Sequence, residues 1–171
     1  MAGGNGLAGR ARWILCALLL ANAATAGALG PPPLRDLRGQ PASLARYGGR
    51  MQLLNFWATW CAPCRQEMPA LDRLYGEVDA RRIAIIGIAA DDPVPVRAFV
   101  ARLGIRYPIF SGDPDALFAW SAALGNVNAG LPFSVLLDDS GRVRWTKSGG
   151  LLTAAEVQAA IRKVEKAAPR R

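Results

Sequence analysis

The chain has 171 residues, of which 51% are hydrophobic, and it carries a formal net charge of +8. That length suits one domain behind a leader, and that apolar content is enough for a packed core. The basic excess comes from 18 Arg and 3 Lys that are scattered along the chain, with Arg-Arg pairs only at Arg81-Arg82 and Arg170-Arg171. A solvated basic surface is therefore expected, and nucleic-acid binding is not.

Residues 1–26 have the three parts of a signal peptide. Arg10 and Arg12 supply a positive start, residues 13–24 form an apolar stretch, and Ala24-Thr25-Ala26 fits a cleavage site. The apolar stretch is short for a membrane-spanning helix, so a cleaved signal peptide is favoured and an uncleaved N-terminal membrane anchor is the alternative. Without this leader, the chain keeps 19 basic and 13 acidic residues, a net charge of +6.

Cys16 lies inside the apolar stretch and would be lost with the leader. Leu15 stands before it, where a lipoprotein signal would have a small residue, so a lipid anchor is not expected. The mature chain would then hold only two cysteines, Cys61 and Cys64. A protein without a spare thiol suits an oxidising compartment.

After the leader, residues 27–37 are rich in Pro and Gly and predict a tether, and residues 38–168 predict one α/β domain. Nearly continuous apolar runs predict strands that are covered on both faces, which together with the helices implies a central mixed sheet with helices on both sides. The expected elements are a strand at 51–59, a helix at 61–79, a strand at 83–90, a helix at 94–104, a short extended piece at 107–112, a helix at 115–124, a hairpin at 133–149 and a last helix from 153.

Local signals mark several of these boundaries. Gly104 is a stop signal for the helix before it, and Ser140-Gly141 predicts the turn of the hairpin. Thr153, with Glu156 three residues later, predicts a capping box at the start of the last helix.

Cys61 and Cys64 form a C-x-x-C pair where a buried strand passes into a helix. The free N–H groups and the positive end of the helix dipole stabilise a thiolate at that position. We therefore expect Cys61 to be the exposed attacking sulfur and Cys64, one turn inside the helix, to be the buried resolving sulfur. Trp60 and Pro63 would flank the pair with apolar surface for a partner peptide.

Two other uses of the pair fit the sequence less well. A zinc site needs four ligands, but the chain has no histidine and no second C-x-x-C. A purely structural disulfide would close a loop of only two residues and would constrain the unfolded chain little. No metal and no dissociable cofactor are therefore expected.

The segment "NFWATWCAPC", followed by "RQEMP", resembles the active site of TlpA/ResA-like thiol–disulfide oxidoreductases. The likeness extends over roughly residues 38 to 165, including "GLPFSVLLDDSGRV", which is similar to that family's stretch around a cis-proline. The resemblance implies a thioredoxin-like fold, with a central mixed sheet flanked by helices and a strand-and-helix insertion before the cis-proline.

The resemblance also implies roles for residues beyond the cysteines. Pro132 matches the cis-proline that faces the pair and presents the backbone of Leu131 to a substrate strand; an ordinary trans proline is the alternative. Glu67 matches an acidic residue that modulates the pKa of the thiols in the family, and it could take the proton from Cys64. The alternative is that Glu67 is an ordinary solvated glutamate on the helix surface. Asn55 stands where many thioredoxins have a buried aspartate, which shifts the proton relay toward Glu67.

The implied function is dithiol–disulfide exchange by an exported, periplasmic oxidoreductase, soluble after leader cleavage or anchored in the inner membrane. The family favours a reductant of protein disulfides, in cytochrome c maturation or copper-centre assembly. Its partners would be protein thiol or disulfide substrates and a membrane electron donor with its own cysteine pair. Nothing in the sequence demands a dimer, so a monomer is expected.

Three other functions stay open on the same residues. A disulfide oxidase or isomerase would use the same fold, because Ala62 and Pro63 do not settle the reduction potential. A peroxidase of the peroxiredoxin type needs a P-x-x-x-T-x-x-C loop, and the proline of that pattern is missing here. A copper chaperone would use the two thiols as soft ligands, although Met68 fits a core position better than a third ligand.

Overall fold

A computed structural model describes residues 30–167. The predicted leader, residues 1–26, lies outside the described residues. Within residues 30–167, no helix is both long enough and apolar enough to cross a membrane.

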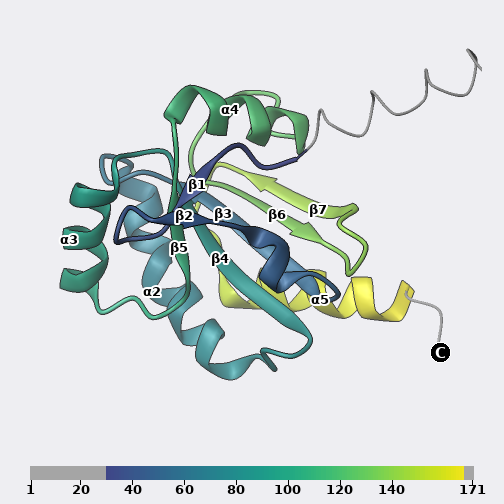
Figure 1. Ribbon diagram of the computed structural model, residues 1–171. Helices are drawn as coiled ribbons and strands as arrows, with labels where there is room; N and C mark the ends of the chain where they lie inside the picture. The colour runs from purple at the N-terminus through teal and green to yellow at the C-terminus, as the bar shows by residue number, and fades with distance from the viewer. Residues whose placement is uncertain (1–29, 168–171) are drawn as a thin grey trace, which may run out of the picture. The chain divides into compact units, whose positions relative to one another are not determined.

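A seven-stranded mixed sheet forms the centre of the domain, in the order β2-β1-β5-β4-β3-β6-β7 (Figure 1). Its three middle strands run parallel, β6 and β7 continue antiparallel beyond β3, and β1 pairs antiparallel with β5 at the other side. The strands are β1 Leu34–Arg35, β2 Pro41–Ala42, β3 Met51–Trp57, β4 Ile83–Ala89, β5 Ile109–Ser111, β6 Phe133–Leu137 and β7 Val143–Ser148.

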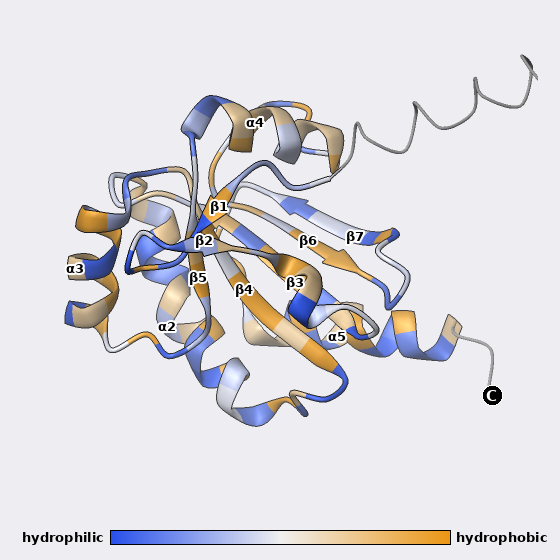
Figure 2. Cartoon of the chain, in the orientation of Figure 1, coloured by the Kyte–Doolittle hydropathy of each residue, from blue (hydrophilic) through white to orange (hydrophobic). Residues whose placement is uncertain are grey.

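Helices cover both faces of this sheet. The helices are the 3-10 turn η1 Leu44–Tyr47, α2 Ala62–Glu77, α3 Pro93–Leu103, α4 Pro114–Ala123 and α5 Ala154–Ala167. Side chains of α2, α3 and α5 share one buried cluster with Leu53 and Trp57 of β3, whereas η1 and α4 share the other with Leu54 and Phe56. Because successive strand residues point to opposite faces, β3 feeds both cores, and Figure 2 shows its residues and those of β4 as mostly apolar.

The predicted α/β fold with a thioredoxin-like mixed sheet is confirmed. Gly104 ends α3 in the left-handed conformation, with φ of 65°, which a residue without a Cβ adopts at little cost. Before α5, the hydroxyl of Thr153 accepts from the N–H of Glu156 at 3.2 Å, and the Glu156 carboxylate accepts from the N–H of Thr153 at 2.9 Å. That reciprocal pair is the predicted capping box.

The tether predicted for residues 27–37 is wrong at its C-terminal end. Leu34–Arg35 form β1, Leu34 is buried, and Arg35 pairs with Ser111 of β5. The sequence did not predict this strand, because the surrounding residues are rich in Pro and Gly and two residues are too few to show the alternation of apolar and polar residues that marks a strand. Leu34 and Arg35 therefore belong to the sheet and not to a tether.

Candidate active site

The cysteine pair lies where β3 passes into α2. Cys61 is the N-cap residue of α2 and forms a disulfide with Cys64. The backbone N–H of Cys64 points at the Cys61 sulfur, with 3.3 Å between N and Sγ. A thiolate on Cys61 would accept that N–H and would lie at the positive end of the helix dipole.

Cys61 is the more accessible cysteine, but only slightly. It exposes 5% of its surface and Cys64 exposes none. Cys61 is more accessible than Cys64, as predicted. The expectation that Cys61 is exposed is wrong, because its side chain packs against the apolar core below α2. Only a small part of the Cys61 surface is therefore accessible to a partner in the disulfide form.

Exposed apolar residues flank Cys61 in the sequence. Trp60 is 65% exposed, immediately before Cys61. Pro63 is exposed in the first turn of α2, where a proline costs no backbone hydrogen bond. Both residues leave apolar surface exposed next to the cysteine pair in the sequence, and their contact with a partner peptide stays a prediction.

Glu67 is buried on the same side of α2 as Cys64, since residues three apart on a helix share one face. One carboxylate oxygen accepts from the side-chain amide of Asn55 at 2.7 Å, and the other accepts from the backbone N–H of Leu152 at 2.9 Å. Burial raises the pKa of Glu67, and the hydrogen bonds from Leu152 and Asn55 partly oppose that rise. The alternative of a solvated glutamate is therefore wrong.

The Leu131–Pro132 peptide bond is cis, as the family resemblance implied, and the alternative of a trans proline is wrong. Phe133, which follows it, pairs with Phe56 near the end of β3, so the cis bond and Cys61 share one edge of the sheet. The carbonyl of Pro132 accepts from Gly149 at 2.9 Å. Within the described residues, no hydrogen bond uses the backbone of Leu131, which leaves its N–H and carbonyl available to an added strand.

These features agree with the comparisons to known proteins. The AhpC/TSA family model matches residues 28–146. The chain belongs to the AhpC/TSA family. The chain is similar to curated ResA proteins, among them the thiol-disulfide oxidoreductase ResA of Halalkalibacterium halodurans, with 32% identity over 120 residues. That alignment covers 69% of this chain and 65% of the relative, so the chain spans just under two thirds of that protein's length.

Solved structures give the same picture of the fold. A thioredoxin-related protein from Neisseria meningitidis serogroup B superposes with a TM-score of 0.70 at 27% identity, over 78% of this chain and 98% of that one. A thiol:disulfide interchange protein of the thioredoxin family from Chlorobium tepidum TLS superposes with a TM-score of 0.64 at 28% identity, over 78% and 94% of the two chains. The predicted membership in the TlpA/ResA-like, thioredoxin-fold group is confirmed.

Within this AhpC/TSA-family site, the structure adds a residue that supports the loop before the cis-proline. Asn126 is fully buried, and its side-chain amide donates to the hydroxyl of Ser121 at 3.1 Å and to the carbonyl of Gly130 at 2.9 Å. These bonds join the end of α4 to the residue before Leu131. A single asparagine in a Gly- and Asn-rich stretch gave no sequence signal for this role.

Two further polar side chains complete the site. Ser134 of β6 accepts from the amide of Asn55 at 3.0 Å, so the amide bridges Ser134 and Glu67. A lone serine in the apolar run "FSVLL" was a usable signal for this contact. Asp91, which follows β4, accepts from the N–H of Thr59 at 3.1 Å and fixes the loop before Cys61.

Metal-binding side chains do not gather near this pair. Across residues 30–167, no group of three or more His, Cys, Asp or Glu side chains is placed to hold a metal ion.

Proposed function

We propose that this protein is an exported thiol–disulfide oxidoreductase that reduces protein disulfides by dithiol–disulfide exchange at Cys61 and Cys64. The observation that carries the proposal is the position of the pair. A disulfide at the N-terminus of α2 shares an edge with a cis-proline and lies above a buried glutamate. A disulfide that served stability alone would require none of these neighbours.

The first step requires the reduced protein, with Cys61 as the thiolate. Its sulfur attacks one sulfur of the substrate disulfide, the substrate S–S bond breaks, and the other substrate sulfur leaves as a thiolate. Cys61 is then joined to the substrate in a mixed disulfide. A substrate strand would pair with the free backbone groups of Leu131, and the apolar surfaces of Trp60 and Pro63 would contact its side chains.

The second step releases the substrate. The Cys64 thiol passes its proton to the carboxylate of Glu67, and the Cys64 thiolate attacks the sulfur of Cys61. The Cys61–Cys64 disulfide forms and the second substrate thiolate departs, so two electrons have moved from the protein to the substrate. Because burial raises the pKa of Glu67, its carboxylate is a stronger base than an exposed one.

A membrane protein with its own cysteine pair would return the two electrons. This donor, a periplasmic location and substrates such as apocytochrome c or copper-centre assembly proteins are implied by the ResA-like resemblance. The chain itself contributes the predicted leader in residues 1–26 and the absence of a cysteine outside the leader other than the C-x-x-C pair. Either leader cleavage or retention as an anchor would place the domain in an oxidising compartment.

Trapping the mixed disulfide tests the proposal directly. The mature protein with Cys64→Ala should accumulate a covalent adduct with a disulfide-containing peptide, because Cys61 attacks and nothing resolves the product. The matched Cys61→Ala variant should form far less adduct, since Cys64 has no exposed surface. Equal trapping by both variants would contradict the assigned order, and no trapping by either would contradict the exchange chemistry.

A further inference from the structure

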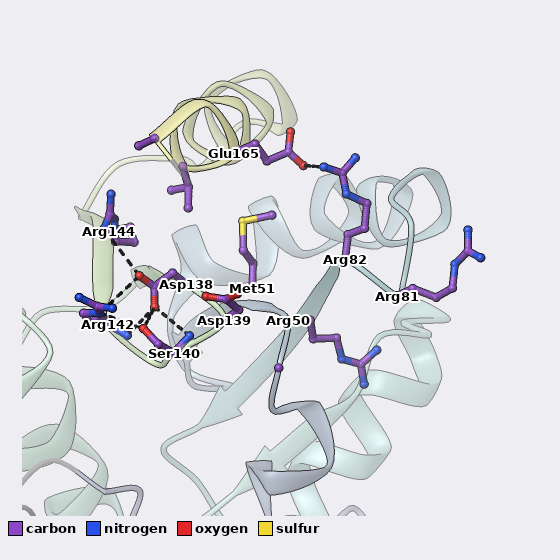
Figure 3. Close-up of a pocket in the computed structure, with 13 residues that line it drawn as sticks. Arg50, Met51, Arg81, Arg82, Asp138, Asp139, Ser140, Arg142, Arg144 and Glu165 are labelled. Carbon is purple, nitrogen blue, oxygen red and sulfur yellow. Dashed lines mark hydrogen bonds and ion pairs between the residues drawn. The ribbon is translucent and has the colours of Figure 1, made fainter. Parts of the chain in front are cut away.

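A concave site lies at the start of β3, away from the cysteine pair, and Figure 3 shows the residues that line it. It is a cavity of about 660 Å³, formed by the start of β3, the segment before β4, the β6–β7 turn and the end of α5. Cys61 lies a few residues after Trp57, the last residue of β3, whereas Met51, the first residue of β3, lines the cavity. Since β3 alone spans roughly 20 Å, this cavity is separate from the candidate active site.

Five arginines line this cavity: Arg50, Arg81, Arg82, Arg142 and Arg144. They come from three segments far apart in the chain, so the fold collects arginines that the sequence shows as scattered. These side chains are solvated, as expected, but they are gathered at one end of the molecule. The acidic residues of the lining are Asp138, Asp139 and Glu165, which leaves an excess of two positive charges.

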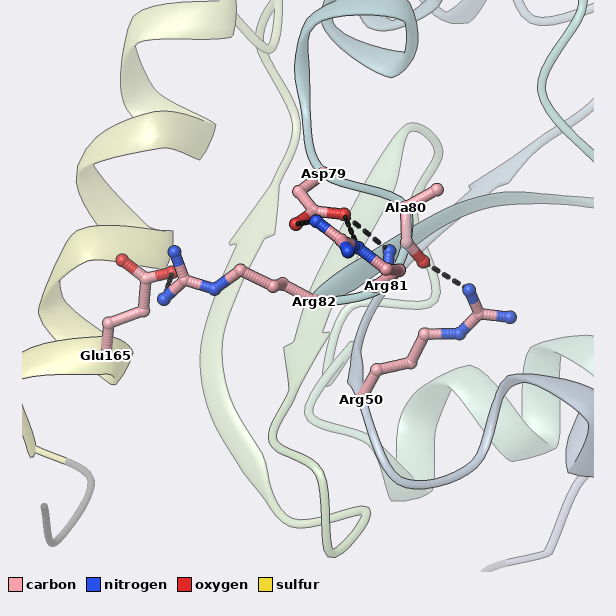
Figure 4. Close-up of polar contacts among 6 residues, drawn as sticks. All are labelled: Arg50, Asp79, Ala80, Arg81, Arg82 and Glu165. Atoms are coloured by element: carbon pink, nitrogen blue, oxygen red, sulfur yellow. Dashed lines mark hydrogen bonds and ion pairs between the residues drawn. The ribbon is translucent and has the colours of Figure 1, made fainter. Parts of the chain in front are cut away.

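Arg50 carries a guanidinium group that is fixed in place but not neutralised. Its side chain donates to the carbonyls of Ala80 and Arg46 and stacks over the ring of Tyr47, 5.1 Å from the ring centre (Figure 4 shows the Ala80 contact). Among the described residues, no carboxylate lies within ion-pair distance of Arg50. An ordered guanidinium loses little further side-chain entropy on binding an anion.

Arg142 and Arg144 share one carboxylate at the other end of the cavity. Both pair with the same oxygen of Asp138, at 3.8 and 3.6 Å, which is longer than a hydrogen bond. The other oxygen of Asp138 already accepts from Ser140 and from the N–H of Arg142. One carboxylate thus faces two guanidinium groups, and N–H donors of both remain available to a ligand.

Arg82 and Arg81 have closer partners, although neither is enclosed. Arg82 pairs with Glu165 at 2.7 Å, and Arg81 pairs with Asp79 at 3.1 Å (Figure 4). The guanidinium-bearing side chain of Arg81 is 91% exposed. With Asp79 counted beside the three acidic residues of the lining, five arginines face four carboxylates, which leaves an excess of one positive charge. The negative end of α5 also lies at this cavity and offsets about half of that charge.

We propose that this cavity binds a small anion that carries two or more phosphate or carboxylate groups. The two ends of the cavity, Arg50 with Arg81 and Arg82, and Arg142 with Arg144, would each hold one oxyanion. Guanidinium groups match such oxyanions with paired N–H donors. The volume lies in the range of small-molecule sites, and it favours a compact ligand over a membrane or a nucleic acid, which bind over extended surfaces.

Titration calorimetry at low ionic strength with inorganic pyrophosphate tests the proposal on the mature, oxidised protein. Inorganic phosphate serves as the single-oxyanion comparison, and citrate tests carboxylate against phosphate chemistry. We expect one saturable site for pyrophosphate, weaker binding of phosphate, and a higher midpoint of thermal unfolding with the ligand present. Replacing one arginine at each end, Arg50→Gln with Arg144→Gln, should weaken pyrophosphate binding about tenfold or more.

The matched control is Arg73→Gln with Arg97→Gln, which removes the same charge from exposed positions on α2 and α3 outside the cavity. This control should change the affinity by less than about twofold. Since Arg50 also supports its neighbours, Arg81→Gln with Arg142→Gln provides a second variant at side chains that are 91% and 77% exposed. It should also weaken binding while the fold stays intact.

Three outcomes would overturn the proposal. One is no binding of pyrophosphate or citrate, and another is an equal loss of affinity in the cavity and control variants, which would indicate a response to net charge alone. The third is binding to phosphatidylglycerol vesicles or single-stranded DNA that pyrophosphate does not displace. That result would assign the arginines to an extended surface instead of a small-molecule site.

Discussion

Glu67 is a buried carboxyl group with two hydrogen-bond donors, and no positively charged side chain among residues 30–167 lies within hydrogen-bond distance of it. The N–H of Leu152 and the amide of Asn55 occupy its two oxygens. Burial penalises the charged form more than these neutral donors stabilise it, so the pKa of Glu67 is raised. A buried carboxyl group of this kind lowers the stability of the fold when it is ionised. Its raised pKa makes it well suited to accept a proton from the buried thiol of Cys64.

Replacing Glu67 by Gln should slow the resolving step. Without the carboxylate, the proton of Cys64 has no buried acceptor, and the mixed disulfide should decay about 100-fold more slowly near neutral pH. Rapid-quench measurement of the mixed disulfide checks this. Glu77→Gln, at the exposed end of the same helix, is the control and should decay at the wild-type rate. Equal rates for Glu67→Gln and the wild type would remove Glu67 from the proton path.

The same residue should give stability a definite dependence on pH. Below the ordinary value of 4.5, Glu67 is protonated in both the folded and unfolded states. As pH rises from there through the raised folded pKa, only the unfolded chain ionises, so the free energy of unfolding falls. Urea unfolding of the oxidised protein at a series of pH values checks this. Over that pH interval the free energy of unfolding of the wild type should fall relative to that of Glu67→Gln, and above it the difference between the two should stay constant. A difference that grows in favour of the wild type as pH rises would contradict the raised pKa.

At the scale of elements, the site depends on where strands end and how one loop is supported. β3, β4 and β5 run parallel, so the residues that follow them meet at one edge. Cys61 follows β3 and Asp91 follows β4, and the bond from Thr59 to Asp91 joins the two ends. The loop before the cis-proline reaches the same edge from α4 and is supported by Asn126.

Asn126→Ala should therefore loosen the substrate side of the site without altering the cysteines. Two buried hydrogen bonds are lost, which should lower the free energy of unfolding by about 1–3 kcal/mol. Since the backbone of Leu131 would be less well ordered, KM for a peptide disulfide should rise more than kcat falls. Reaction with a small disulfide such as oxidised dithiothreitol, which needs no added strand, should be nearly unchanged.

Asn128→Ala is the matched control for that loop, because Asn128 is exposed in the same segment. It should leave both the stability and KM close to the wild type. A fall in kcat with KM unchanged for Asn126→Ala would mean that the loop affects the chemistry itself and would contradict a positioning role.

For the whole molecule, the sequence predicted the elements that have strong local patterns. Continuous apolar runs located β3 and β4, and the Thr153–Glu156 pair located the start of α5, since these signals act over a few residues. The C-x-x-C pair and the cis-proline were found because their positions relative to the strands match a known pattern. The positions of the cysteine pair and the cis-proline could therefore be predicted from the sequence.

The features that the sequence did not reveal depend on contacts between distant segments. β1 is only two residues long, and it can be recognised as a strand only from its pairing with β5. Asn126 supports the loop by hydrogen bonds to Ser121 and Gly130. An asparagine in the sequence does not by itself show whether its side chain is buried and makes such bonds or is exposed in a loop. The arginine cavity is assembled from positions near 50, 80 and 140, which no local window compares.

The reduction potential of the Cys61–Cys64 pair is the measurement that tests the central claim most directly. The mature domain would be equilibrated across glutathione or dithiothreitol ratios, quenched with acid, and its free thiols counted by alkylation. A reductant fed by a membrane donor should give a value near that of thioredoxin, about −270 mV. A value near about −120 mV would contradict the reducing direction, and a disulfide that stayed oxidised at every ratio would contradict the catalytic role of the pair.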